Sequence, residues 1–172
     1  RAWPLFDAAA SRAIEQASAS HLPPHALMQR AGLAVARLAL ALAPHARTVW
    51  LACGPGNNGG DGFEAALHLR SWGKNAVVTW SGEESRLPAD ARASLLRARA
   101  ADVRFTSQVP AEWDLAVDAM LGLGAARPLE GQLAEWASLM ATGARPVLAV
   151  DLPSGLDADT GDRKSTRLNS SH

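Results

Sequence analysis

Cysteine is nearly absent from this 172-residue chain, which contains only Cys53. A disulfide within the chain is therefore impossible, and a zinc site built on a cysteine cluster is not expected. The sequence also lacks any run near the roughly 18 apolar residues that a membrane-spanning helix needs, and no signal-peptide pattern opens it. These absences favour a soluble protein of a reducing compartment, and we expect a cytoplasmic location without membrane attachment.

A surplus of charge of either sign is missing as well. Lys and Arg together number 17, as do Asp and Glu, so the formal net charge is zero. No basic block interrupts this balance, which argues against a nucleic-acid partner held by bulk positive charge. What remains is an ordinary globular composition, with 48% apolar and 20% charged residues. The length suits one domain.

The last ten residues differ in composition from the rest of the chain. Up to Asp162 the sequence is rich in Ala, Leu and Gly, whereas 163–172 is polar and has no hydrophobic periodicity. Such composition is typical of disordered tails. We therefore expect one domain over residues 1–162 and a disordered or non-native tail over 163–172.

Short apolar segments alternate with helix-prone segments along most of the chain. Alternation of this kind predicts βαβ units and therefore an α/β fold with a parallel sheet. The expected strands are 48–53, 75–80, 103–105, 114–118 and 146–151. The expected helices are 7–19, a segment from Pro23 to Pro44, 63–72, 88–101 and 129–140.

Three glycine-containing segments follow predicted strands, at 54–62, 118–124 and 151–155. Ligands of open parallel sheets bind outside the carboxyl ends of the strands, so these segments are the expected site. The first spells G-x-G-x-x-G between a strand and a helix, which is the dinucleotide-binding pattern. Asp61, at the expected helix start, departs from that pattern because a carboxylate there would repel a phosphate.

Two interpretations of the first segment remain open. Asp61 is either a helix N-cap or a ligand contact that requires a nearby cation. Asn57 and Asn58 are either turn residues or polar groups that offer carbonyl oxygens and N–H donors to a ligand or an ion.

Asp118 and Asp151 each end a predicted strand. Either one alone could be a turn residue, but two carboxylates facing one glycine-rich segment could hold a monovalent cation or transfer protons. Hard cations take oxygen ligands, and the Asn58 amide, the Asp118 carboxylate and the Ser154 hydroxyl would supply part of such a shell. In 122–128, backbone N–H groups could bind phosphate with Arg127, or Arg127 is simply solvated.

Several of these motifs together resemble those of the YjeF N-terminal family, the NAD(P)H-hydrate epimerases. The segment GPGNNGGDG at 54–62 resembles the signature loop of the family. LMQRAG at 27–32, VDAMLGLG at 117–124 with RPLEG at 127–131, and VDLPSG at 150–155 resemble its other motifs, in the same order.

The resemblance implies a Rossmann-like three-layer α/β/α sandwich with a mostly parallel central sheet, often found as a homodimer. It implies an isomerase that interconverts the R and S epimers of hydrated NADH and NADPH (NADHX and NADPHX) at C6 of the nicotinamide ring. It also implies a bound potassium ion. A separate ADP- or ATP-dependent dehydratase, fused to the C-terminus in many bacteria, is the implied functional partner.

The resemblance also assigns roles to residues. Potassium would be held by Asn58, Asp118 and Ser154. Asp151 is the expected acid/base group, because proton shuttling at C6, which carries a hydroxyl and the ring nitrogen, could open and reclose that centre. The implied substrate-binding residues are Asn57, Asn58, Gly59, Gly60, Asp61, Gly122, Leu123, Gly124, Ala125, Ala126, Arg127, Pro128 and Asp151.

One departure and two alternatives accompany this hypothesis. The family domain continues with a further strand and helix where this chain has its polar tail, and the loss of a strand would expose a sheet edge. The first alternative is a non-catalytic nucleotide- or partner-binding module. The second is an ordinary NAD(P) dehydrogenase, for which Glu83 and Glu84, just after the second strand, would bind the ribose.

Overall fold

The computed structural model describes residues 6–19, 21–123 and 128–162. Its centre is one sheet in the order β3-β2-β1-β4-β5, and every strand pair in the described part of the chain is parallel. The parallel α/β prediction is therefore confirmed. The strands are β1 (Thr48–Cys53), β2 (Asn75–Trp80), β3 (Arg104–Thr106), β4 (Leu115–Ala119) and β5 (Val147–Ala149).

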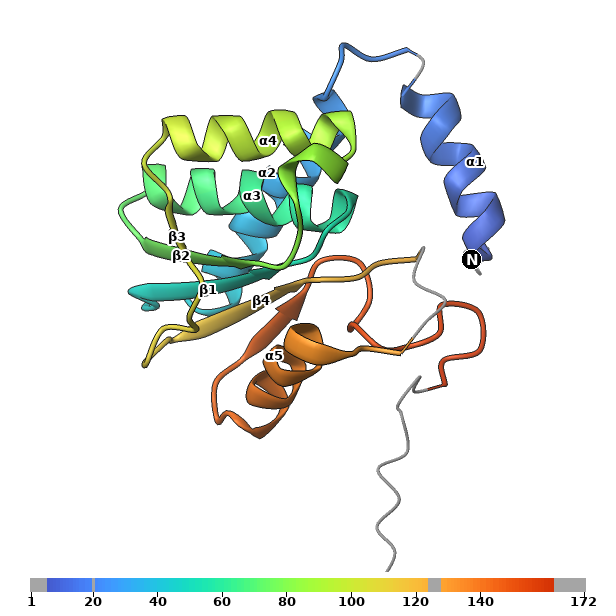
Figure 1. Ribbon diagram of the computed structural model, residues 1–172. Coiled ribbons are helices and arrows are strands. Elements are labelled where there is room, and N and C mark those ends of the chain that lie inside the picture. The colour runs from blue at the N-terminus through green and yellow to red at the C-terminus, as the bar shows by residue number, and fades with distance from the viewer. Residues whose placement is uncertain (1–5, 20, 124–127, 163–172) are drawn as a thin grey trace, which may run out of the picture.

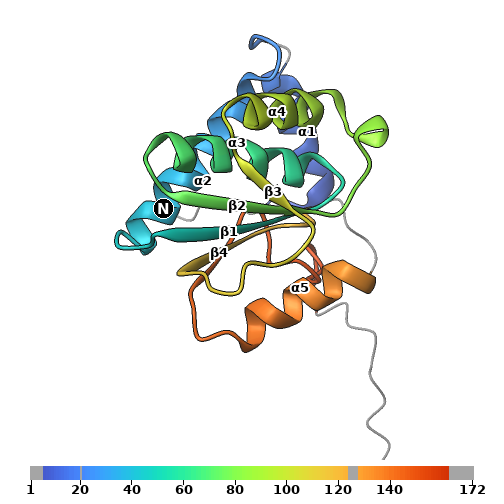
Figure 2. The ribbon, with the colours of Figure 1, turned by 60° about the vertical axis from the view of Figure 1, so that its left-hand side comes forward.

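Helices cover both faces of the sheet, as a three-layer sandwich requires. Figures 1 and 2 show α2, α3 and α4 on one face and α5 on the other, while α1 stands apart beside the sheet. The α-helices are α1 (Ala8–Ala19), α2 (Ala26–Leu42), α3 (Asn57–Ser71), α4 (Ala89–Ala100) and α5 (Gly131–Thr142), with a 3₁₀ turn η1 (Glu84–Arg86). No helix within these described ranges is long and apolar enough to cross a membrane.

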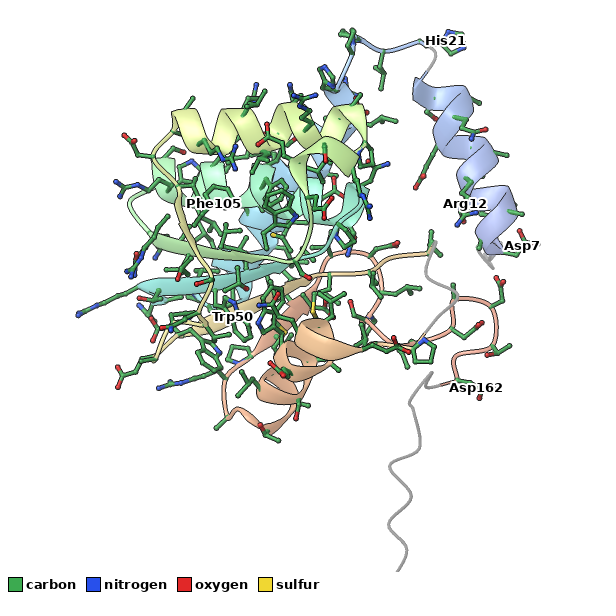
Figure 3. The ribbon with its side chains drawn as sticks, viewed as in Figure 1. Asp7, Arg12, His21, Trp50, Phe105 and Asp162 are labelled. Atoms are coloured by element: carbon green, nitrogen blue, oxygen red, sulfur yellow. The ribbon has the colours of Figure 1, made fainter. Side chains whose placement is uncertain are left out.

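The side chains of β1 alternate between two apolar cores. Leu51 packs with Phe63 on the side of α2–α4, whereas Trp50 packs with Trp136 and Met140 of α5. Figure 3 shows Trp50 on the α5 side of the sheet and Phe105 on the opposite side. Because both faces are covered, β1 reads in sequence as a continuous apolar run, which explains why it could be predicted.

The helix expected to begin at Phe63 begins six residues earlier, at Asn57, with Gly56 as its N-cap. The prediction of a loop through Gly62 was therefore wrong, and so was the interpretation of Asp61 as an N-cap. The glycines serve close packing rather than turns. A Cβ at Gly60 would lie 2.8 Å from Cα of Ala91, and one at Gly62 would lie 2.6 Å from Sγ of Cys53.

The crossover helices leave the sheet in opposite directions at its middle. The helix α3 follows β1 on one face and α5 follows β4 on the other, although β1 and β4 are neighbours. Their register pairs Cys53 with Ala119, so the two strands end side by side. Such a switch point opens a crevice at the carboxyl ends of the strands, where ligands bind. Figure 1 shows α1 at the same end of the sheet.

Candidate functional site

A cavity of about 910 Å³ lies at the carboxyl ends of β1, β4 and β5. It joins the three segments that the sequence analysis selected, together with α1 and α2. Six of the predicted substrate-binding residues line it: Asn57, Asn58, Asp61, Gly122, Leu123 and Asp151.

The other predicted substrate-binding residues lie elsewhere or outside the described chain. Gly59 and Gly60 are buried in the first turns of α3 and serve the packing of that helix. Pro128 is half-buried and is not among the residues that line the cavity. The predicted residues Gly124, Ala125, Ala126 and Arg127 lie outside the described residues.

Asp118 and Ser154, two of the predicted potassium ligands, are joined directly. Ser154 donates its backbone N–H to Oδ2 of Asp118 at 2.7 Å and its hydroxyl to Oδ1 at 2.6 Å. The N–H of Met120 donates to Oδ1 at 3.2 Å, and the N–H of Leu121 donates to the Ser154 hydroxyl at 3.0 Å. These bonds tie the segment after β4 to the segment after β5.

Burial has the largest effect on the pKa of Asp118. Loss of water raises the pKa of this carboxyl above its ordinary value, although the hydrogen bonds from Ser154 and Met120 act in the opposite direction. An Asp118 carboxylate therefore gains from any additional positive charge beside it.

Asp118→Ala is expected to lower the free energy of unfolding by about 3 kcal/mol, because it leaves buried donors of Ser154 and Met120 without their charged acceptor. Asp114, which directly precedes β4, is the matched control. It accepts the N–H groups of Arg47 and Thr48 at 2.8 and 2.9 Å, but at the water-exposed edge. Urea unfolding should show a clearly smaller loss of unfolding free energy for Asp114→Ala than for Asp118→Ala. Equal losses for the two variants would contradict this account.

Asn58, Gly122 and Asp151 meet on the cavity wall. The N–H of Leu123 donates to Oδ2 of Asp151 at 2.7 Å. A Cβ at Gly122 would lie 2.5 Å from that same oxygen and 3.3 Å from Oδ1 of Asn58, so only glycine leaves room here. The buried Nδ2 of Asn58 has no hydrogen-bond partner. A buried polar group without a partner indicates a place for a ligand or water.

The three predicted potassium ligands offer only oxygen atoms to an ion: an amide, a carboxylate and a hydroxyl. Hard cations prefer this chemistry, and the direct Asp118–Ser154 contact already holds two of the three groups together. Among the described residues no cluster of three or more His, Cys, Asp or Glu side chains could hold a metal ion. Because all three donors are oxygen atoms, the set suits a hard cation such as potassium better than a transition metal.

Asp61 lines the same cavity without a hydrogen-bond donor from the described residues. Burial, followed by repulsion from Asp151, Glu15 and Glu64, raises the pKa of Asp61 from 3.8 to about 7. The carboxyl is therefore partly protonated near neutral pH, which the sequence alone did not indicate.

Part of the cavity wall comes from α1 and α2, which no sequence motif indicated. Arg12 and Glu15 of α1 line the cavity, and Arg12 is labelled on that helix in Figure 3. Four apolar residues of α2 complete this wall: Ala31, Ala34, Val35 and Leu38. Helical spacing made the α2 positions look like core, and no motif distinguishes Arg12 or Glu15 from surface residues.

Comparison with known proteins shows the family to which this chain belongs. Residues 24–172 match the family described as YjeF-related protein N-terminus. An NAD(P)H-hydrate epimerase of Rhodobacter capsulatus is 46% identical over 145 residues, which cover 77% of this chain and 67% of that protein. One of Rhodopirellula baltica is 34% identical over 170 residues, covering 94% and 68%. The chain thus spans about two thirds of the length of these relatives.

Two further similarities concern a longer protein and a solved structure. A protein of Thermofilum pendens named bifunctional NAD(P)H-hydrate repair enzyme is 37% identical over 145 residues, which cover 78% of this chain and 28% of that protein. The crystal structure of yeast ynu0 superposes with a TM-score of 0.79 at 23% identity, covering 92% of this chain and 74% of that one. The latter likeness supports the fold.

Proposed function

Because the chain belongs to the YjeF-related N-terminal family, we propose that it is an isomerase that epimerises hydrated NADH and NADPH at C6 of the nicotinamide ring. The observation that carries this proposal is the convergence of three separate sequence motifs on one cavity. Asn58, Gly122 and Asp151 come from the segments after β1, β4 and β5 and lie within contact distance around Gly122.

The reaction needs proton transfer at a carbon that carries both a hydroxyl and the ring nitrogen. Asp151 is the proposed acid/base group, because it lines the cavity and its carboxylate is oriented by the Leu123 N–H. The 122–128 segment, including the undescribed Gly124–Arg127 part, and the N-terminus of α3 would bind the phosphate-bearing part of the substrate.

Potassium is the proposed cation, held by Asn58, Asp118 and Ser154. When bound, the ion supplies positive charge that offsets the carboxylates and allows phosphates to approach them. Asp118 is buried, and a neighbouring cation would stabilise a buried carboxylate in its charged form.

The proposed functional partner is a dehydratase that acts on one epimer, in this chain's own protein or in a separate one. The name of the bifunctional Thermofilum pendens relative, of which this chain matches 28%, supports the association. The homodimer and the cytoplasmic location stay predictions from the sequence.

The dehydrogenase alternative loses its main support in the structure. Glu83 pairs with Arg86, and Glu84 pairs with Arg92 and Arg99. Neither glutamate lines the cavity. Both glutamates are therefore engaged in ion pairs outside the cavity.

The purified chain should accelerate conversion of R-NADPHX to S-NADPHX in potassium buffer, and less so when sodium replaces potassium. Chromatographic separation of the epimers measures both rates against a no-protein control. Unhydrated NADPH with an electron acceptor serves as the second control and should show no hydride transfer. Epimerisation that is independent of the cation would overturn the potassium assignment, and hydride transfer would restore the dehydrogenase.

A further inference from the structure

Asp61 is a half-buried carboxyl that lines the cavity, and the proposed mechanism has not yet used it. It comes from the second turn of α3 and faces the cavity together with Asp151. Three carboxylates act on it, Asp151 after β5, Glu15 on α1 and Glu64 on its own helix, and Arg12 on α1 lines the same cavity.

The four neighbouring groups do not neutralise Asp61. Glu64 is fully buried and is itself occupied, because its Oε1 accepts from the Ser94 hydroxyl at 3.1 Å and from Nε of Arg97 at 2.9 Å. No hydrogen bond or ion pair joins Asp61 to Arg12 or to any other side chain of the described residues. Three carboxylates around an unpaired, poorly hydrated carboxyl favour its neutral form.

We propose that Asp61 is a second catalytic residue, which donates a proton to the ring nitrogen while Asp151 accepts the proton of the C6 hydroxyl. This inference rests on the proposed epimerase function. It assigns the acid role to the half-buried Asp61 and the base role to the exposed Asp151, and such a difference in environment lets two like side chains do opposite chemistry.

The step balances without any further reactant. The bond between C6 and the ring nitrogen breaks, and its electron pair stays on the nitrogen, which receives the proton of Asp61. The C6 hydroxyl gives its proton to Asp151 and becomes an aldehyde. After rotation of the aldehyde, the nitrogen attacks the other face of C6, Asp151 returns its proton to the oxygen, and Asp61 recovers its own.

Two observations support these roles. The pKa of Asp61, raised to about 7 by burial and by its acidic neighbours, suits a general acid that works near neutral pH. Glu15, one of those neighbours, lies on α1, outside residues 24–172 that match the family. A residue outside the family-matched segment therefore contributes to the raised pKa of Asp61.

Asp61→Asn should lower kcat for R-NADPHX by about 10²-fold or more, with KM changed only a few-fold. In the wild type, kcat should fall as the pH rises through about 7, because Asp61 loses its proton. Glu15→Gln should move this fall to lower pH, since it removes a charge that repels the ionised form. Glu112→Gln, at an exposed site away from the cavity, is the matched control and should leave the profile in place.

Unfolding supplies a readout that does not depend on activity. A carboxyl whose folded pKa is raised costs stability as the pH rises from its ordinary pKa of 3.8 toward its folded pKa of about 7. The stability of Asp61→Asn relative to wild type should therefore rise between about pH 4 and pH 7 and stay level at higher pH. An active wild type with unchanged kcat in Asp61→Asn would overturn this inference alone. A wild type that is folded yet inactive would overturn the epimerase function together with it.

Discussion

Asp151→Ala is expected to reduce epimerase turnover by about 10²–10⁴-fold, the usual contribution of a positioned proton-transfer group. Asp151 combines two features that this role needs: it lines the cavity, and the Leu123 N–H at 2.7 Å holds its carboxylate in one orientation. Turnover is measured by following R and S NADPHX over time. Binding of the substrate is measured separately by calorimetry.

Asp151→Asn separates catalysis from support of the loop. Its amide oxygen still accepts the Leu123 N–H, so the geometry around Gly122 is kept, but it cannot take a proton near neutral pH. Both variants should lose turnover while substrate binding persists. Full turnover in Asp151→Asn would contradict the catalytic role and leave Asp151 as an anchor for residues 122 and 123. A wild type that binds the substrate without turnover would instead favour the binding module.

Gly59→Ala is expected to lower the free energy of unfolding by about 3 kcal/mol. A Cβ at this position would overlap the carbonyl oxygen of Gly54, and one at Gly54 would overlap that of Met120. Backbone therefore meets backbone where β1, β4 and α3 come together, and no side chain can move aside. The roughly 0.5–1 kcal/mol by which alanine is the better helix former is too small to offset this overlap.

Gly56→Ala is the matched control, three residues earlier in the same segment. A Cβ at Gly56 would meet nothing within 4 Å, and its φ of −117° suits any residue. Gly56→Ala should lower the free energy of unfolding by less than about 1 kcal/mol, because alanine is a weaker N-cap than glycine. Urea denaturation of both variants tests the difference. Similar stabilities for the two would mean that the three elements are not packed as closely as described.

The strands and helices could be predicted because local patterns determine them. The buried strand β1 is a run of apolar residues, and α4 follows Pro88 and ends before the turn at Ala101. The start of α3 could not be predicted from the same patterns. Its glycines look like loop residues in sequence, whereas in the fold they allow Gly60 and Gly62 to touch Ala91 and Cys53.

Some residues of the cavity could likewise be predicted from the sequence, and others could not. The place of Asp151 on the cavity wall could be predicted, because parallel strands bring their carboxyl ends to one edge of the sheet. The contribution of α1 could not, since nothing in the sequence states where Arg12 and Glu15 lie relative to Asp61. The raised pKa of Asp61 depends on burial and on charges distant in sequence, so only the three-dimensional arrangement reveals it.

The central claim is that this cavity interconverts the two epimers, and an approach to equilibrium from both sides tests it most directly. R-NADPHX and S-NADPHX are incubated separately with the purified chain in potassium buffer, and each is followed by chromatography beside a no-protein control. The account predicts that both mixtures reach the same ratio of epimers, well before the controls do. Interconversion that is no faster with the chain than in the no-protein controls would contradict it.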